Sequence, residues 1–148
     1  MIATLQGSSA AHDDDFYLDS PLNGLGLIFN NHTTPIGTTR DLGFFTAGTE
    51  LIFKVHVENT GDDFFSGPGS RNLNGLEHAV EDDAFAPGQT LVGFEDLYGG
   101  GDRDYNDVQF TFTNVRGGQG SSVPEPATLA LAGIGLGLAA PRRKAQRV

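Results

Sequence analysis

The chain has 148 residues, no cysteine and a formal net charge of −10. A single domain of this length can bury a core without disulfides, and the absence of cysteine excludes thiol catalysis and cysteine-ligated zinc. The acidity excludes nucleic acid as an expected partner, because such binding depends on Lys and Arg that neutralise phosphates. The 21 glycines disfavour a helical bundle and favour a loop-rich β fold.

The charge is divided between two parts of the chain. Residues 1–123 carry 18 of the 19 acidic side chains but only five of the nine basic ones. Residues 124–148 carry one acidic and four basic side chains, so the sign of the charge changes there. This asymmetry predicts a main acidic domain followed by a targeting segment.

The first segments in chain order carry little strand signal. Residues 1–11 are small and polar, and we expect a disordered N-terminus there. They lack the positive cluster and apolar core of a secretory signal peptide. Residues 12–15 (His-Asp-Asp-Asp) form an acidic cluster, and alternation typical of a strand begins with Leu25, Leu27 and Phe29.

Later segments alternate more clearly. In residues 51–57 the side chains of Leu51, Phe53, Val55 and Val57 share one face, which predicts a half-buried strand. We expect a long loop over 59–76, a short strand over 91–94 and a strand over 107–113. These spacings suit an antiparallel β-sandwich, of the jelly-roll or immunoglobulin-like kind, over residues 12–116.

The C-terminal part begins with a Gly/Ser linker over 117–122. An unbroken run of small and apolar residues follows, Ala127 to Ala140, and then the basic cluster Arg142, Arg143 and Lys144. The run predicts an apolar helix of about 21 Å, short for a membrane core of about 30 Å unless the flanking residues add to it. The basic cluster would stay on the cytoplasmic side, so the main domain would lie outside.

The tail resembles the PEP-CTERM sorting signal. The matching residues are Val123-Pro124-Glu125-Pro126-Ala127-Thr128-Leu129, the apolar run and the basic cluster, in that order over 123–148. The resemblance implies export in a Gram-negative bacterium and transient anchoring in the inner membrane. It also implies cleavage by an exosortase-type protease near Pro124, Glu125 and Pro126, and an association with exopolysaccharide and the biofilm matrix. Members of that family carry an N-terminal signal peptide, so the resemblance implies a signal upstream of Met1 or, alternatively, a chain that is not exported.

An acidic loop over residues 93–107 is the segment richest in chemistry. It holds five carboxylates and one carboxamide, together with three consecutive glycines. Crowded carboxylates repel one another unless a cation lies among them, and Ca²⁺ accepts carboxylate, amide and carbonyl oxygens in flexible geometry. The sequence therefore predicts a Ca²⁺ loop between two strands. The candidate ligands are Glu95, Asp96, Asp102, Asp104, Asn106 and Asp107.

Other interpretations of this loop remain open. The Asp-x-Asp-x-Asn spacing begins like an EF-hand, but neither the glycine at position six nor the glutamate at position twelve is present. Asp, Asn and Gly are also ordinary turn residues, and Arg103 could pair with Glu95 or Asp96 on the surface. His78 also has more than one interpretation. It could bind a metal or act as a general base, but a hydrogen-bonding role at the surface or in a hairpin is more common.

The same loop resembles the signature of a bacterial family, domain of unknown function 4114. The match runs through Leu91-Val92-Gly93-Phe94-Glu95-Asp96-Leu97 and Gly99-Gly100-Gly101-Asp102-Arg103-Asp104-Tyr105-Asn106-Asp107-Val108, with Glu77-His78-Ala79 upstream. It covers residues 44–114 and implies a compact β-sandwich found in secreted and surface proteins. The family has no established activity.

Together these features predict a non-catalytic, Ca²⁺-binding domain displayed at the cell surface or in the extracellular matrix. One alternative is a carbohydrate-binding module that uses Tyr17, Tyr98 or Tyr105 to bind exopolysaccharide. A less favoured alternative is a polysaccharide hydrolase that uses Glu95, since glycosidases need two carboxylates across a sugar-sized cleft.

Overall fold

The structure, a computed structural model, describes residues 1–117. The predicted membrane helix, the sorting motif, the basic cluster and nearly all of the predicted linker fall on residues 118–148 and so lie outside the described residues. Within residues 1–117, no helix is long and apolar enough to cross a membrane.

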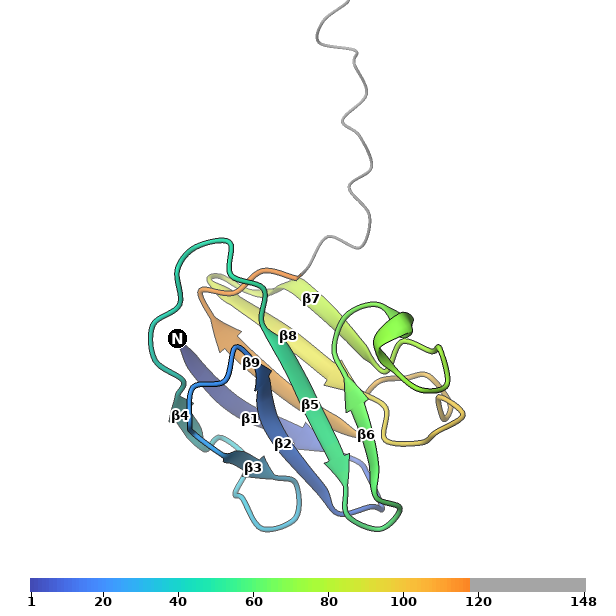
Figure 1. The fold of residues 1–148 in the computed structure, drawn as a ribbon. Helices are drawn as coiled ribbons and strands as arrows, with labels where there is room; N and C mark the ends of the chain where they lie inside the picture. Colours follow the sequence, from blue (N-terminus) through green and yellow to red (C-terminus); the bar gives the residue numbers. More distant parts are fainter. Residues whose placement is uncertain (118–148) are drawn as a thin grey trace, which may run out of the picture.

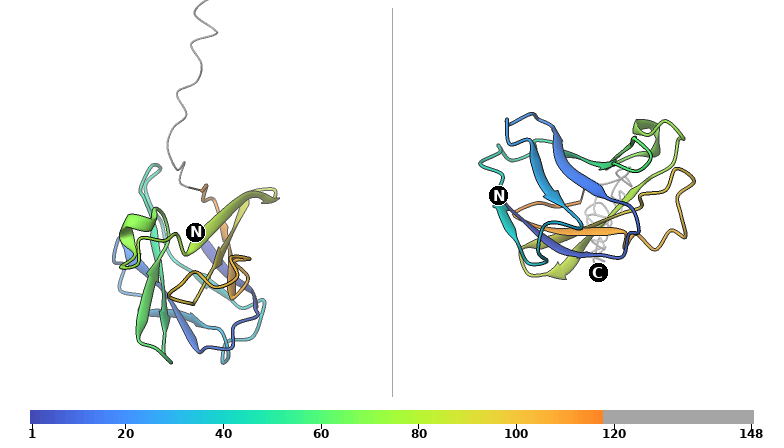
Figure 2. Two further views of the ribbon diagram at one scale, coloured as in Figure 1. Left: turned by 90° about the vertical axis from the view of Figure 1, so that its right-hand side faces the viewer. Right: turned by 90° about the horizontal axis from the view of Figure 1, so that it is seen from below.

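The described chain folds into two antiparallel sheets. Its elements are β1 (Ile2–Ser8), β2 (Asp14–Ser20), β3 (Leu27–Asn30), β4 (Thr39–Asp41), β5 (Ile52–Val57), β6 (Asp62–Phe65), the 3₁₀ helix η1 (Gly69–Arg71), β7 (Ala79–Ala86), β8 (Gln89–Phe94) and β9 (Val108–Thr113). The first sheet has the order β4-β1-β9-β8-β7, and the second has the order β3-β2-β5-β6. The two sheets form facing layers (Figures 1 and 2). The prediction of an all-β, antiparallel, two-layered fold is confirmed.

Phenylalanine side chains fill the space between the layers. Phe16 on β2 stacks on Phe110 of β9 with ring centroids 3.7 Å apart, and it meets Phe94 of β8 edge to face at 6.0 Å. Phe53 on β5 stacks on Phe112 of β9 at 4.4 Å. Each pair joins one sheet to the other, so burial of these rings holds the two layers together.

The strands with the clearest alternation were predicted correctly, as were their faces. Phe53, Val55 and Val57 on β5 are buried, and so are Phe110 and Phe112 on β9. In both strands the intervening side chains lie on the other face, where most are half-buried and Thr111 is buried. A period of two places alternate side chains on one face of any strand, which is why the pattern was visible in the sequence.

The expectation of a disordered N-terminus over residues 1–11 is wrong. Residues 2–8 form β1, an inner strand that pairs with β4 on one side and β9 on the other. Ala3 and Leu5 are fully buried beneath the second sheet. Because β9 lies more than 100 residues away in the chain, the backbone partners that order β1 leave no local trace in residues 1–11. The domain therefore includes residues 2–8 and is not limited to residues 12–116.

Four further strands were missed in the sequence. The predicted loop over 59–76 contains β6 and η1, the acidic cluster at 12–15 includes the first two residues of β2, and β4 has only three residues. The fourth, β7, is an edge strand whose side chains are almost all exposed, so it has no hydrophobic alternation to reveal it. In β3 a register irregularity buries Ile28 beside Phe29 and leaves Leu27 half exposed.

Two connections meet the acidic loop at one end of the sandwich. The loop joins β8 to β9, and the segment between β1 and β2 lies against its last residues, where the amide groups of Ser9 and Ala10 donate to Asp107 O at 3.1 and 3.2 Å. On its other side lies the connection from η1 to β7, from which the side-chain amide of Asn74 donates to Tyr98 O. Figure 1 shows this second contact as two neighbouring loops, one green and one yellow to orange.

Candidate metal centre

Three carboxylates of the acidic loop converge. Glu95, Asp102 and Asp104 each place one carboxylate oxygen so that the three oxygens lie within 4.8 Å of one another. Calcium–oxygen bonds are about 2.3–2.6 Å long, so one ion can touch three oxygens spaced in this way. Asp102 and Asp104 are exposed, whereas Glu95 is only 1% exposed.

Glu95 is held by one of its two oxygens. Oε1 accepts a hydrogen bond from the amide of Tyr105 at 2.8 Å, while Oε2 is buried and has no partner within the described structure. An unpaired carboxylate oxygen away from water is costly. Glu95 Oε2 is therefore the atom in this loop with the most to gain from a cation.

The loop backbone is shaped to fit around this carboxylate. Gly101 has φ +48°, and a Cβ there would overlap Glu95 Oε2. Arg103 and Tyr105 also have positive φ, 62° and 54°, which non-glycine residues seldom adopt. Such strained residues cluster at functional sites, where the surroundings compensate their cost. At Gly93 in β8, a Cβ would overlap the Tyr105 carbonyl, so the strand and the loop pack without room for a side chain there.

The negative charges around Glu95 would be stabilised by a bound cation. Burial raises the pKa of Glu95, and the charges of Asp107, Asp102 and Asp104 raise it further, against a lowering by the hydrogen bond from Tyr105. None of the ion pairs found within residues 1–117 involves Glu95, Asp102 or Asp104. Pairing of Arg103 with Glu95 or Asp96, the alternative interpretation, is not seen in this part of the chain.

The six predicted ligands do not form one group. Asn106 stays beside the first three, because its amide donates to Asp104 Oδ2 while its own oxygen accepts from Ser9. Asp96 turns away from Glu95 and approaches His12, whose Nδ1 lies 3.3 Å from Asp96 Oδ2. Asp107 lies beside Asp96, whose backbone amide donates to its Oδ2 at 3.0 Å, and its charge raises the pKa of both Glu95 and Asp96.

Asp14 joins Asp96 and was missed in the sequence. It is the first residue of β2 and is 2% exposed. Asn31 binds its Oδ2 through a side-chain amide at 3.2 Å, and Oδ1 has no partner. Burial raises the pKa of Asp14 to about 8, and the charges of Asp96 and Asp107 add to the effect. The signal was present in the sequence, because Asp14 is in phase with Phe16 and Leu18, the buried face of β2.

His78 is a buried hydrogen-bonding residue, as the commoner interpretation expects, although it is not at the surface. Its ring stacks on Phe64 with centroids 3.9 Å apart. Asn74 donates to Nε2 at 2.8 Å, so Nδ1 carries the proton and donates to Glu95 O at 3.0 Å. Burial lowers the pKa of His78, which keeps the ring neutral. His78 thus fixes the backbone of Glu95 rather than contacting a ligand.

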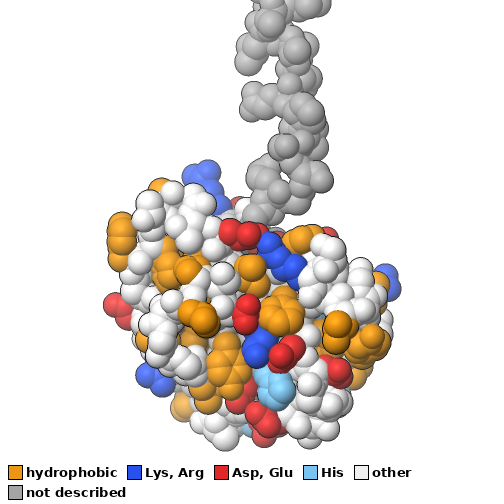
Figure 3. All heavy atoms as spheres, viewed as in Figure 1, with side chains coloured by type: hydrophobic (Ala, Val, Ile, Leu, Met, Phe, Trp, Pro, Cys, Tyr) orange, Lys and Arg blue, Asp and Glu red, His pale blue; other side chains and the backbone are white. Residues whose placement is uncertain are grey.

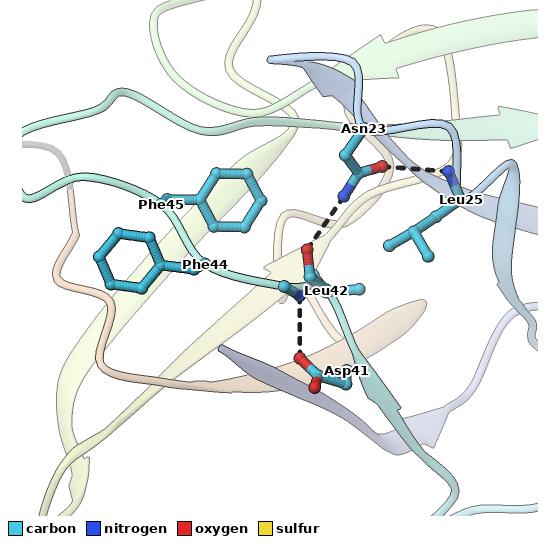
Figure 4. A pocket seen from close by; sticks show the side chains of 7 residues that line it. Asn23, Leu25, Asp41, Leu42, Phe44 and Phe45 are labelled. Carbon is cyan, nitrogen blue, oxygen red and sulfur yellow. Dashed lines mark hydrogen bonds between the residues drawn. The ribbon is translucent and has the colours of Figure 1, made fainter.

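A shallow pocket lies elsewhere, on the side of β3 and β4. It has a volume of about 350 Å³ and is lined by Asn23, Leu25, Asp41, Leu42, Gly43, Phe44 and Phe45. Figure 4 shows that its polar side chains are already bonded to the backbone. Asn23 binds Leu42 O and the amide of Leu25, and Asp41 accepts from the amide of Gly43. Because these polar side chains already have backbone partners, the pocket is not the candidate centre.

The outer face of the second sheet carries charged side chains that pair with each other. His56 Nδ1 lies 2.7 Å from Asp63 Oδ1, and Lys54 Nζ lies 3.4 Å from the same oxygen. Figure 3 shows acidic, basic and histidine side chains gathered on this face. Exposed pairs of this kind contribute little to stability. Because the acidic side chain already has basic partners, this face is not a candidate cation site.

Comparison with known families places the loop within a recognised domain. Residues 45–114 match the family model described as Domain of unknown function (DUF4114), and residues 122–144 match the PEP-CTERM protein-sorting motif. The chain therefore has a segment similar to DUF4114, followed by a segment that matches the PEP-CTERM motif. Both predicted resemblances are confirmed. No curated protein and no solved structure matches the chain.

The PEP-CTERM tail defines the coarse biology of the protein. A chain with this motif is exported, held transiently at the membrane by its tail and processed by an exosortase, which is a membrane protease. The DUF4114 segment spans β5 to β9 and includes the whole acidic loop. The strands β1 to β4, with His12 and Asp14, lie outside that segment, although they complete both sheets.

Proposed function

We propose that the β-sandwich is a non-catalytic domain stabilised by Ca²⁺ and displayed at the cell surface or in the extracellular matrix of a Gram-negative bacterium. In this proposal the PEP-CTERM tail delivers the domain to the outer side of the inner membrane, and exosortase processing releases it from the anchor. Outside the cell, where Ca²⁺ is abundant, the ion binds the acidic loop and makes this surface of the domain rigid.

The observation that carries the proposal is the position of Glu95. This carboxylate is buried, one of its oxygens has no partner, and that side chain converges with Asp102 and Asp104 within 4.8 Å. A hard divalent cation would satisfy the free oxygen and cancel the repulsion among three carboxylates. The exposure of Asp102 and Asp104 leaves one side of the centre open, so water can supply further ligands.

The mechanism is charge neutralisation that orders a connection. Glu95 directly follows β8, whereas Asp102 and Asp104 belong to the strained turn that leads back to β9. An ion bound to all three carboxylates would fix the turn against the end of β8. Its binding free energy would compensate the cost of the positive φ angles at Arg103 and Tyr105. Affinity in the range of about 10⁻⁴–10⁻³ M is typical of extracellular calcium modules.

A non-catalytic role is supported by the burial of the best acid candidate. A glycosidase acid must reach the glycosidic oxygen, but Glu95 is 1% exposed and its Oε1 is held by Tyr105. For the carbohydrate-binding alternative, Tyr98 is the half-exposed tyrosine, while the Tyr105 hydroxyl donates to Glu77 O at 3.5 Å. Exopolysaccharide therefore remains a second candidate ligand, which glycan-array binding lost in Tyr98→Ala would support.

The proposal is tested by thermal unfolding of the full chain with and without 10 mM CaCl₂. At ten times the dissociation constant, binding adds about 1.4 kcal/mol to the free energy of unfolding, which raises Tm by roughly 4 to 7 °C for a chain of this size. EGTA should reverse the rise. The double variant Asp102→Asn and Asp104→Asn should fold and lose the response.

Asp82→Asn is the matched control. Asp82 is an exposed carboxylate on β7, and its Oδ1 accepts from the amide of Ala84, a bond that asparagine can keep. This variant should respond to calcium as the wild type does. An unchanged Tm of the wild type in CaCl₂, or an equal loss of response in Asp82→Asn, would overturn the proposal.

A further inference from the structure

A second group of unsatisfied carboxylates lies between the two sheets. Asp14 and Asp96 are 2% and 4% exposed, and each has one buried oxygen without a hydrogen-bond partner, Oδ1 of Asp14 and Oδ2 of Asp96. His12 Nδ1 also has no hydrogen-bond partner and lies 3.3 Å from that oxygen of Asp96. Two carboxylate oxygens without a hydrogen bond, Asp14 Oδ1 and Asp96 Oδ2, are therefore buried at the same end of the sandwich, and the imidazole of His12 forms an ion pair with the second.

The strand geometry explains why these side chains meet. Phe16 on β2 and Phe94 on β8 face each other across the core with centroids 6.0 Å apart. Side chains two residues along a strand lie on the same face, so Asp14 continues the inner face of β2 and Asp96 continues that of β8. The two carboxylates thus form the next layer beyond a contacting pair of core aromatics. Burial raises the pKa of Asp14 to about 8, and the charges of Asp96 and Asp107 raise it further.

Hydrogen bonds around this group hold one oxygen of Asp14 in place and fix Asp107 beside Asp96. Asn31 donates to Asp14 Oδ2 at 3.2 Å, which leaves Oδ1 unpaired. The amide of Asp96 donates to Asp107 Oδ2 at 3.0 Å, which fixes Asp107 beside Asp96. Asn31 also binds the carbonyl oxygen of His12 at 2.9 Å, so the segment that carries the imidazole is anchored to the same asparagine. Such neighbours are typical of residues that orient the ligands of a metal.

We propose that His12, Asp14, Asp96 and Asp107 form a second divalent-cation site that joins β2 of one sheet to the β8–β9 connection of the other. An imidazole nitrogen among carboxylates suits Mn²⁺ or Zn²⁺ better than Ca²⁺, which prefers oxygen alone. The site is independent of the calcium proposal, since it shares no ligand with Glu95, Asp102 and Asp104.

The ion would draw its ligands together. Within residues 1–117, Glu95, Asp102 and Asp104 are the one set of three ligand atoms already within 4.8 Å of one another. The second group is not such a set, so its side chains would have to rotate toward the ion as it binds. Because His12 and Asp14 precede the DUF4114 segment at 45–114, the ion would link that segment to the N-terminal strands.

Mn²⁺ is the probe for this site, because the electron paramagnetic resonance signal of free Mn²⁺ is lost on binding. The full chain is titrated with MnCl₂ in 10 mM CaCl₂, which occupies the loop centre. We expect one Mn²⁺ to bind the wild type and at least a tenfold weaker affinity in Asp14→Asn and in His12→Gln. Asp15→Asn, which removes the same charge from the other face of β2, should bind as the wild type does.

Asp14→Asn keeps the fold testable, because asparagine has nearly the same shape and, like the protonated side chain of Asp14, carries no charge. Its Tm without metal should equal or exceed that of the wild type, while the Mn²⁺-dependent rise in Tm disappears. In NMR spectra of the wild type, Mn²⁺ should broaden the imidazole signals of His12 at concentrations that leave those of His56 intact.

The outcomes separate the two sites. Asp104→Asn should abolish the calcium response and preserve Mn²⁺ binding, whereas Asp14→Asn should do the reverse. The second site is overturned if the wild type binds no Mn²⁺ in excess calcium, if Asp14→Asn or His12→Gln binds it unchanged, or if Asp104→Asn alone removes it. Failure of the calcium response with Mn²⁺ binding intact would overturn only the calcium proposal.

Discussion

The side chains of Glu95 and Asp96 are neighbours in the sequence but enter different groups of carboxylates. Glu95 joins Asp102 and Asp104, and Asp96 lies beside His12. Both residues directly follow β8, so the alternation of the strand continues for two more positions and sends consecutive side chains to different sides. A single acidic run in the sequence therefore becomes two separate sets of potential ligands.

The free energy of unfolding should fall as the pH rises from about 4 to 8 in the presence of EGTA. The pKa of Asp14 is about 8 in the folded chain and its ordinary value is 3.8. Across this interval the folded state holds a proton that the unfolded state has lost, so the stability that it contributes is complete below pH 4 and disappears toward pH 8. Urea unfolding at pH 5, 6, 7 and 8 measures the slope.

The same experiment on Asp14→Asn provides the control for the pH effect. Asparagine does not titrate, so its curve should be flatter than that of the wild type over the same interval. Glu95 and Asp96 also have raised pKa values, and a residual slope is expected from them. Identical slopes in the two proteins would contradict the assignment to Asp14.

Gly101→Ala should destabilise the acidic loop and remove the calcium response. An alanine at φ +48° costs about 1–2 kcal/mol, and its Cβ would overlap Glu95 Oε2, the proposed calcium ligand. Gly99→Ala is the matched control, because a Cβ there meets no atom within 4 Å. Calcium titrations monitored by Tm compare the two. A normal response in Gly101→Ala would show that the close approach to Glu95 is unimportant.

Phe16→Ala should cost about 3–5 kcal/mol of the free energy of unfolding, the usual range for a buried phenylalanine. The ring of Phe16 contacts Phe94, Phe110 and Phe112 of the opposite sheet, so its removal leaves a cavity between the layers. Phe44→Ala is the comparison, since Phe44 is 92% exposed and its loss should change stability by less than about 0.5 kcal/mol. Chemical denaturation of both variants measures the difference.

Leu5→Ala should cost about 2–5 kcal/mol if β1 belongs to the core as the structure has it. Leu5 is fully buried on an inner strand of the first sheet. Leu22, at 86% exposure, offers the same substitution with an expected effect below about 0.5 kcal/mol. Equal effects of Leu5→Ala and Leu22→Ala on urea unfolding would mean that the N-terminal segment does not pack in solution.

Local patterns in the sequence were enough for much of the fold. The alternation in residues 51–57 and 107–113 predicted β5 and β9 with the correct buried faces, because a strand repeats every two residues wherever it pairs. The sorting tail was identified from a contiguous motif, and the acidic loop from its composition. Each of these features is encoded within fewer than 30 consecutive residues.

Tertiary structure decided what depends on residues far apart in the chain. The strand β1 is ordered by β9, more than 100 residues away, and a segment with so few large apolar side chains shows no sign of that partner in its own sequence. Asp14 lies with Asp96 because Phe16 and Phe94 meet across the core. The sequence by itself determined that the loop is acidic and rich in oxygen ligands. Only the packing of two sheets divided those ligands into two groups and buried one carboxylate oxygen without a partner in Glu95 and another in Asp14.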